Sequence, residues 1–341
     1  GHRLGYNLFA ESLVCLDART GELVWHYQTV HHGIWDYDLP APPNLVTIEV
    51  DGRVIDAVAQ VTKQGFTFVF DRVTGEPVWP IEERPVAAST VPGERTAPTQ
   101  PFPTKPAPFA RQGFSLDDVI DLTPELRADA LELIQSYQLG PLFTPPSLEG
   151  TITMPGAVGA VAWGGAAFDP RTHVLYVPSK NLPFVHGLVE PEPGTADADY
   201  VQRIRGLNVS GIPIVKPPWG TMTAIDLDSG DHLWQVAVGD RPDIRENPAL
   251  AGVDLPPLGW MYNEGPMATG GDLVFLGGRN PRLYAIDSET GETLWSGDLL
   301  GNQGTSNPMT YRTSEGKQIV VIGVTGPGSD RGMIAFALPG A

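Results

Sequence analysis

The chain has 341 residues, more than one compact core usually holds, which predicts either several domains or one architecture that grows by repetition. Its 40 acidic and 22 basic residues give a formal net charge of -18, which argues against nucleic acid or an anionic membrane as the main partner. The single Cys15 excludes an internal disulfide and a multi-cysteine metal site, and we expect it to be a small buried residue of a strand.

A repeated motif runs through the chain, in which an Asp precedes a Trp by eight residues. The four copies cover residues 13–25, 67–79, 223–234 and 283–295. Each copy predicts a β-hairpin, because an apolar strand ends at the Asp, a Gly that accepts a positive φ follows, and the return strand ends in the Trp. A large Trp at a fixed place can fill the gap between neighbouring sheets, so stacked copies share one core. The sequence therefore predicts an all-β protein, a β-propeller of four-stranded blades.

The aspartates of the motif have a structural reason to exist. A carboxylate at the start of a tight turn accepts hydrogen bonds from the backbone of that turn. We therefore expect turn acceptors rather than catalysts at Asp17, Asp71, Asp226 and Asp287.

A fifth and degenerate copy begins at Phe168. It keeps Asp169 and Thr172, but His173 stands where the Gly belongs and no Trp follows. We interpret it as a degenerate blade, which brings the expected number of blades to about five.

A long insertion is expected over residues 84–150. It holds a proline-rich run at 101–108 and then one inserted helix, for which Thr123 is a plausible N-cap and Pro124 a suitable first residue. The apolar stripe of this helix consists of Leu126, Ala130, Leu133, Ile134 and Tyr137, and Gly140 follows as the end. We expect the insertion to form a lid or brace over one face of the propeller.

Residues 25–40 (WHYQTVHHGIWDYDLP) carry a resemblance to a known family. Together with shorter matches at 61–66, 98–102, 143–147, 162–165 and 307–318, this stretch resembles the dehydrogenases that depend on pyrroloquinoline quinone, closest to the membrane-type glucose dehydrogenase branch. The resemblance implies an eight-bladed propeller, of which residues 1–341 are an incomplete part. The chain starts without methionine, and we expect a fragment whose missing blades, lying before Gly1, supply most ligands of a Ca²⁺ or Mg²⁺ ion.

The same resemblance suggests the catalytic residues. It makes Asp36 the general base, close to the metal ion, and places Lys63 beside the quinone oxygens, where a cation stabilises developing negative charge. An Asp between two aromatic residues is also a candidate for a desolvated carboxylate. The alternatives are that Asp36 or Asp38 caps a turn and that Lys63 is an ordinary surface lysine.

Further residues near this stretch have weaker signals. His31 and His32 lack a cluster of other metal ligands, which favours a structural role. Trp163 precedes two glycines that allow close backbone approach and is a candidate for the cofactor site, with plain blade packing as the alternative. Asn181 falls near the place where the family contacts the quinone with an amide, with an imperfect local match.

The implied function is oxidation of a sugar or alcohol hydroxyl by hydride transfer to bound pyrroloquinoline quinone. Electrons would pass to ubiquinone or a cytochrome, and since the chain has no Cys-x-x-Cys-His motif, any cytochrome lies elsewhere. A periplasmic location is implied, with any tether to the inner membrane in a segment absent from this chain. The alternative is a non-enzymatic propeller that serves as a scaffold for protein interaction in the cell envelope.

Overall fold

Strands dominate the computed structural model, which describes residues 3–260, 263–278, 280–326 and 331–338. Within these ranges the helical segments are two α-helices and one 3₁₀ turn, namely α1 (Pro124–Ile134), α2 (Pro242–Arg245) and η1 (Pro248–Leu250). The all-β prediction is confirmed, although α2 and the 3₁₀ turn were not expected.

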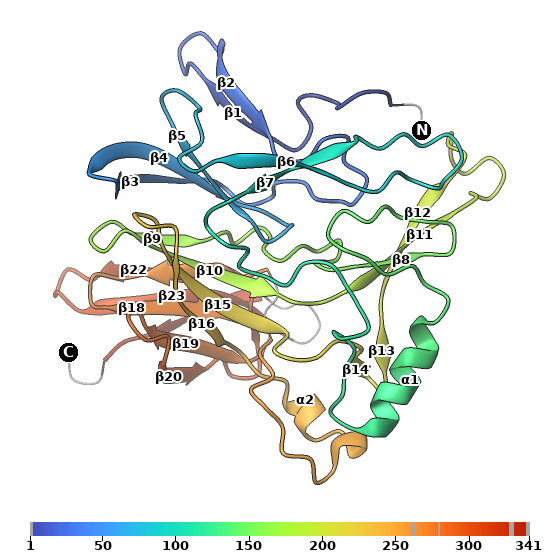
Figure 1. Ribbon diagram of the computed structural model, residues 1–341. Coiled ribbons are helices and arrows are strands. Elements are labelled where there is room, and N and C mark those ends of the chain that lie inside the picture. The colour runs from blue at the N-terminus through green and yellow to red at the C-terminus, as the bar shows by residue number, and fades with distance from the viewer. Residues whose placement is uncertain (1–2, 261–262, 279, 327–330, 339–341) are drawn as a thin grey trace.

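Five antiparallel sheets of the described residues follow one another along the chain and correspond to blades, from β1–β2 at the top of Figure 1 to the sheet that carries β22 and β23, labelled at the left. The first two are β1 (Ser12–Leu16) with β2 (Leu23–Gln28), and β3 (Asn44–Val50) with β4 (Arg53–Val61) and β5 (Thr67–Asp71). The third consists of β9 (Ala167–Asp169), β10 (Val174–Lys180), β15 (Gly220–Asp226) and β16 (His232–Ala237). The fourth consists of β17 (Pro266–Ala268), β18 (Leu273–Gly277), β19 (Arg282–Asp287) and β20 (Thr293–Asp298). The last consists of β21 (Gln303–Gly304), β22 (Met309–Arg312), β23 (Gln318–Thr325) and β24 (Arg331–Phe336). Cys15 lies in β1 as expected but is half-buried rather than buried.

The remaining strands lie in two insertions. The first insertion carries β6 (Ile81–Pro85), β7 (Thr99–Pro103), α1 and β8 (Thr151–Thr153). The second separates β10 from β15 and carries β11 (Phe184–Val189), β12 (Val201–Gly206), β13 (Asn208–Val209) and β14 (Ile212–Pro213). Sequence analysis did not predict the second insertion. The two insertions meet in one sheet, because β11 pairs with both β8 and β12.

The degenerate copy of the motif is not a blade of its own, so this prediction was wrong. Asp169 and His173 lie in the turn between β9 and β10, within the sheet that also carries the copy ending at Trp234. His173 occupies the glycine position with a φ of 58°. Its ring is held there by the Asp228 carboxylate, which lies 2.9 Å from Nδ1. The fifth sheet is instead the C-terminal one.

The Asp–Trp motif joins neighbouring sheets as predicted. Trp25 Nε1 donates to the carbonyl of Arg72 at 2.9 Å, and Trp234 Nε1 donates to that of Ser288 at 3.1 Å, so each indole binds the Asp turn of a following sheet. The turn glycine must be small there, because a Cβ on Gly291 would lie 2.8 Å from the Trp234 ring. The aspartates are turn acceptors: Asp287 Oδ1, for example, accepts the backbone N–H groups of Glu289 and Thr290 at 3.0 and 2.8 Å.

Helix α1 begins as predicted. Thr123 caps it by accepting the Leu126 N–H at 3.2 Å, Pro124 is its first residue, and Leu126, Ala130 and Ile134 are buried. The helix ends at Ile134, earlier than the expected Gly140. Its buried face packs on residues of the second insertion, among them Trp219, and it lies at the lower right of Figure 1, beside the blades.

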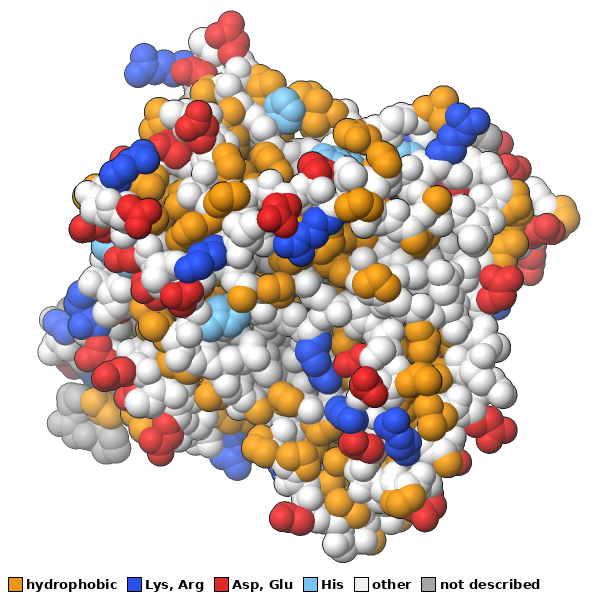
Figure 2. Space-filling model, viewed as in Figure 1, with side chains coloured by type: hydrophobic (Ala, Val, Ile, Leu, Met, Phe, Trp, Pro, Cys, Tyr) orange, Lys and Arg blue, Asp and Glu red, His pale blue; other side chains and the backbone are white. Residues whose placement is uncertain are grey.

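Helices of the described residues are all too short and too polar to cross a membrane. On the face shown in Figure 2, Lys and Arg side chains alternate with Asp and Glu and form no continuous basic surface.

Candidate functional site

The loop between β2 and β3 presents two carboxylates because two aromatic side chains anchor it. Trp35 and Tyr37 are buried, with Trp35 Nε1 donating to the Thr144 carbonyl at 2.8 Å and Tyr37 Oη donating to the Pro155 carbonyl at 2.6 Å. Between them Asp36 adopts a φ of 62°, a left-handed conformation that Asp tolerates better than most residues. The alternation of aromatic and acidic residues therefore directs Asp36 and Asp38 away from the core, and both are about half-exposed.

Lys63 follows β4 and reaches this loop. Its Nζ donates to the Asp36 carbonyl at 3.0 Å, to Asp36 Oδ1 at 3.4 Å and to Asp38 Oδ1 at 2.5 Å. Only 8% of Lys63 is exposed, so it is not an ordinary surface lysine. The structure brings the two predicted residues together, and it adds Asp38, which sequence analysis named only as a turn cap.

The ionisation of Asp36 depends on its neighbours. Burial raises the pKa of Asp36 above its ordinary value of 3.8, and the Lys63 ammonium opposes that increase. Asp38 raises the same pKa further through a hydrogen bond and its negative charge. A carboxylate with a raised pKa binds a proton more readily, which is what a general base requires.

Lys63 is held by a turn of the segment that precedes β9. Ala160 donates its N–H to the Lys63 carbonyl at 2.8 Å, and Gly159 lies so close that a Cβ there would be 2.3 Å from Lys63 Cγ. Lys180, at the end of β10, supports this turn twice, because its N–H donates to the Ala160 carbonyl at 2.8 Å and its Nζ to the Val158 carbonyl at 3.1 Å.

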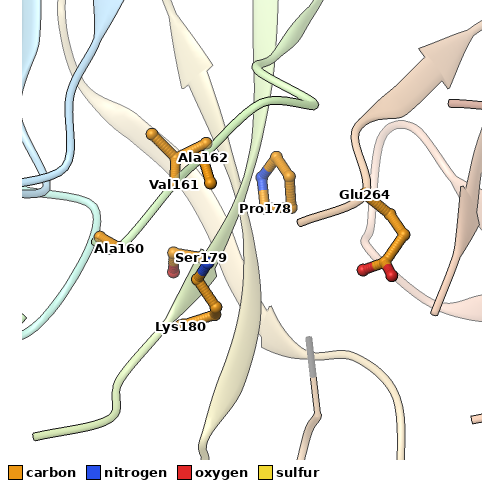
Figure 3. Close-up of a pocket in the computed structure, with 7 residues that line it drawn as sticks. All are labelled: Ala160, Val161, Ala162, Pro178, Ser179, Lys180 and Glu264. Carbon is orange, nitrogen blue, oxygen red and sulfur yellow. The ribbon is translucent and has the colours of Figure 1, made fainter. Parts of the chain in front are cut away.

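Sequence analysis missed Lys180. Its Nζ also donates to Asn263 Oδ1 at 2.8 Å, and burial lowers the pKa of Lys180 to about 7, with Glu264 opposing and Lys63 adding to that decrease. Figure 3 shows Lys180 on β10 with Ala160 on one side and Glu264, on the segment before β17, on the other. Its contacts come from residues 22 and 83 positions away, which no local sequence signal reveals.

Trp163 lies at the surface, with 70% of the residue exposed, so it is not a blade-packing tryptophan. The glycine after it is required for close backbone approach, as predicted, because a Cβ on Gly164 would lie 2.1 Å from the Gly265 nitrogen. Asn307 fastens this contact by donating to the Gly164 carbonyl and accepting the Gly265 N–H, at 2.8 and 2.9 Å.

Asn181 is buried, and both ends of its amide bind protein groups. Its Oδ1 accepts the Arg111 N–H at 3.0 Å and its Nδ2 donates to the Pro218 carbonyl at 3.3 Å. Asn181, the residue after Lys180, thus connects Arg111 of the first insertion with Pro218 of the second.

His31 and His32, which precede Asp36 in the same loop, bind protein groups and have a structural role. The ring of His31 lies between Gln28 and Glu83: its Nδ1 is 3.0 Å from Gln28 Oε1, and its Nε2 is 3.0 Å from Glu83 Oε1. His32 bridges the Gly5 carbonyl and Glu94 Oε1 at 2.7 and 2.9 Å. They fix the start of the Asp36 loop to neighbouring segments.

Two buried polar side chains around Lys63 bear on whether a polar ligand fits here. Among the described residues, neither amide atom of Gln64 has a hydrogen-bond partner, and neither has Nε2 of His186. His186 lies within the electrostatic influence of Lys63. Orphaned polar atoms, a buried ammonium and the exposed indole of Trp163 suit a planar, polar cofactor. For a metal ion, the described residues offer the carboxylates of Asp36 and Asp38 but no cluster of three or more acidic, His or Cys ligands.

Comparisons with known proteins place the chain among the β-propellers of dehydrogenases. The family model described as PQQ, glucose/ethanol/alcohol dehydrogenase, β-propeller domain, matches residues 1–320. The chain belongs to this family.

The relatives are longer proteins. Quinoprotein glucose dehydrogenase of Escherichia coli K12 is 34% identical over 368 residues, covering 97% of this chain and 44% of the relative. Quinate/shikimate dehydrogenase (quinone) of Acinetobacter baylyi is 34% identical over 356 residues, covering 96% of this chain and 44% of the relative. The structure of quinohemoprotein alcohol dehydrogenase from Comamonas testosteroni matches with a TM-score of 0.62 at 23% identity, covering 98% of this chain and 43% of that one, which supports the fold. The chain thus spans less than half the length of these relatives.

Proposed function

We propose that the chain is part of a quinoprotein oxidoreductase that oxidises a sugar or alcohol hydroxyl and passes the hydride to pyrroloquinoline quinone. The observation that carries the proposal is the contact between Lys63 Nζ and Asp36, at 3.0 and 3.4 Å, in a chain that belongs to the PQQ family. The names of the relatives, which are glucose and quinate dehydrogenases, support a hydroxylated substrate.

Each residue has a role that follows from its surroundings. Asp36 is the general base: its half-exposed carboxylate can reach a substrate hydroxyl, and its raised pKa suits proton removal. Lys63 supplies a fixed positive charge in a nearly buried place, where electrostatic stabilisation of a developing oxyanion is strongest. Asp38 balances that charge and keeps Lys63 directed at the Asp36 loop.

Pyrroloquinoline quinone, when bound, supplies the two-electron acceptor that no amino-acid side chain provides. We propose Lys63 and Trp163 as residues that hold it, and Asn181 as a weaker third, because its amide already binds Arg111 and Pro218. Ca²⁺ or Mg²⁺ would take Asp36 as one ligand, and since Ca²⁺ takes about six to eight oxygen ligands, further ligands would be needed besides this carboxylate.

The electron acceptor and the location are further proposals. We propose ubiquinone or a cytochrome as the acceptor, because one relative is named as a quinone-linked enzyme and another, 1-butanol dehydrogenase of Thauera butanivorans, as cytochrome c-linked. We also propose a periplasmic location.

The test uses full-length protein loaded with pyrroloquinoline quinone and Ca²⁺ or Mg²⁺. Dye reduction is measured over a panel of sugars and alcohols. Asp36→Asn should lower kcat by about 100-fold or more while the absorption of the bound cofactor is kept, because general-base catalysis contributes about 10²–10⁴-fold. The matched control is Asp56→Asn, which removes a half-exposed carboxylate that pairs with Arg72 at 3.2 Å.

Two results would contradict the proposal. Turnover retained by Asp36→Asn would place the base elsewhere. A cofactor-loaded protein that reduces no dye with any substrate would favour the interaction scaffold instead.

A further inference from the structure

A second pocket opens on the same edge of the blades as the candidate site. Its volume is about 530 Å³, and its polar lining consists of Asp240, Arg241, Asp243, Trp260, Asn280 and Gln303. Asn280 lies in the connection between β18 and β19, whereas Glu264 precedes β17. Because Pro266 of β17 pairs with Leu276 of β18, Glu264 and Asn280 both lie at the same end of this sheet.

One wall of the pocket is a rigid stack of charged and aromatic groups. The guanidinium carbon of Arg241 lies 4.2 Å from the ring centroid of Trp260. Two of its nitrogens donate to the two carboxylate oxygens of Asp243, at 2.7 and 2.5 Å. The backbone N–H of Trp260 donates to the Val238 carbonyl at 2.8 Å. Gly239, with a φ of 82°, allows this close approach, because a Cβ there would lie 2.2 Å from the Trp260 carbonyl oxygen. A planar pair fixed on an indole is preorganised, which lowers the entropy lost on binding.

The charges of the pocket compensate one another. Asp243 pairs with Arg241, and Asp240 pairs with Arg245 at 2.9 and 2.8 Å. Each carboxylate keeps lone pairs for further donors after such a pairing. A strongly charged ligand would therefore gain little here, whereas a ligand with several hydroxyl groups could both donate and accept.

Asn280 is a fixed polar member of the pocket lining. The residue is only 7% exposed, and its Nδ2 donates to the Tyr284 hydroxyl. Gln303 adds a second, exposed amide to the lining.

We propose that this pocket binds a neutral polyhydroxylated molecule, a sugar or cyclic polyol. Its volume lies within the range of small-molecule sites, about 300–1,000 Å³. Fixed carboxylates, a guanidinium and amides match adjacent hydroxyls, and the indole and prolines match the apolar C–H surface of a ring. The site requires neither Asp36 nor Lys63, so it stands whether or not the proposed catalytic function holds.

The experiment titrates full-length protein, prepared without cofactor, with methyl α-D-glucopyranoside and measures binding by calorimetry or ligand-detected NMR. Saturable binding is expected. Asp243→Ala and Gln303→Ala should each weaken it by about threefold to tenfold, the range expected for one hydrogen bond. Both side chains lie at the surface, with 64% of the Asp243 side chain exposed, so both variants should fold.

Two controls isolate the pocket. Glu82→Gln removes a comparable exposed partner, which pairs with Arg84 at 2.8 Å, and should leave binding unchanged. Asp36→Asn should also leave it unchanged, which separates this site from the catalytic one. Equal binding by wild type, Asp243→Ala and Gln303→Ala would overturn the proposal, and so would tighter binding of glucuronate than of the neutral sugar.

Discussion

At the scale of single residues, the proposed function depends on one nearly buried ammonium group between two half-exposed carboxylates. Lys63 lowers the pKa of Asp36 against the effect of burial, and Asp38 balances the Lys63 charge. A change at Lys63 or Asp38 should therefore alter the titration of Asp36.

Lys63→Met should shift the pH dependence of catalysis. Without the ammonium, the raised pKa of Asp36 rises further, and since the base acts when deprotonated, the acid limb of kcat/KM should move to higher pH. We also expect kcat to fall by about 100-fold, the cost of removing one group that stabilises developing charge. The pH profile of dye reduction measures both effects.

The controls for this prediction are a conservative variant and a distant lysine. Lys63→Arg should keep the acid limb in place. Lys105→Met removes a lysine that pairs with Asp231 at 3.0 Å on the surface and should change nothing. An acid limb that stays at its wild-type pH in Lys63→Met would show that Asp36 does not sense this charge.

Lys180→Met should loosen the turn that holds Lys63. The variant loses the hydrogen bonds from Nζ to Val158 and Asn263, so the Ala160 amide, which donates to the Lys63 carbonyl, should exchange with solvent about tenfold faster. Hydrogen exchange of residues 156–164 measures this effect without requiring activity. Lys216→Met, which removes an ion pair with Asp121, is the control and should leave this exchange unchanged.

At the scale of elements, the Asp–Trp motif is a device for joining sheets. The glycine of one turn faces the tryptophan of an earlier sheet at Gly75 and Trp25, and again at Gly291 and Trp234. A positive φ and a lack of space both require glycine at these positions, and the two requirements can be separated by mutation.

Gly291→Ala should destabilise the protein more than Gly252→Ala. Both glycines have similar φ values, 76° and 79°, so both variants carry the cost of a left-handed alanine. The new Cβ meets the Trp234 ring at 2.8 Å in the first variant and open space in the second. The difference in free energy of unfolding, measured by denaturant titration, should be about 1–3 kcal/mol, the usual cost of overpacking. Equal losses would show that the indole can move aside.

Local patterns predicted the elements that depend on nearby residues. The Asp turns, the cap at Thr123 and the buried positions Leu126, Ala130 and Ile134 of α1 were predicted correctly, because each rests on contacts within a few positions, although the predicted stripe continued to Tyr137, beyond the end of the helix. The degenerate copy at Asp169 was wrongly predicted to be a separate blade. Turn residues predict a hairpin but not the sheet in which its strands pair, and this hairpin pairs within the third sheet. The resemblance at residues 25–40 and 61–66 also singled out Asp36 and Lys63, whose side chains lie in contact in the structure, and their catalytic roles stay predictions.

At the scale of the whole molecule, the site is assembled from segments far apart in the chain. Lys180 meets the turn at Val158 and Asn263, and Trp35 binds the carbonyl of Thr144. Such contacts depend on how insertions pack against blades, which periodicity and turn chemistry do not encode. This is why Lys180, the contact of Asp38 with Lys63 and the pocket at Trp260 emerge only from the structure.

The same long-range packing makes the stability of the protein depend on pH through His186. This residue of β11 is fully buried, and burial, followed by the charge of Lys63, lowers its pKa from 6.5 to about 4. Between these two pH values the unfolded chain binds a proton at this residue and the folded protein does not. The unfolded state is therefore stabilised relative to the folded state as the pH falls. The contribution of His186 to stability is therefore complete above about pH 6.5 and decreases toward about pH 4.

His186→Gln should flatten this part of the pH dependence. Over the interval the free energy of unfolding of the wild type should fall by about 3 kcal/mol from this residue alone, since one pKa unit corresponds to about 1.4 kcal/mol. Urea titrations of wild type and variant between pH 6.5 and pH 4 measure the difference in slope, which a uniform loss of stability in the variant would not mimic. His26→Gln, at an exposed position of β2, should keep the wild-type slope. If wild type and His186→Gln lose stability in parallel, His186 is protonated in the folded protein, and the burial of its ring does not set the acid sensitivity of the fold.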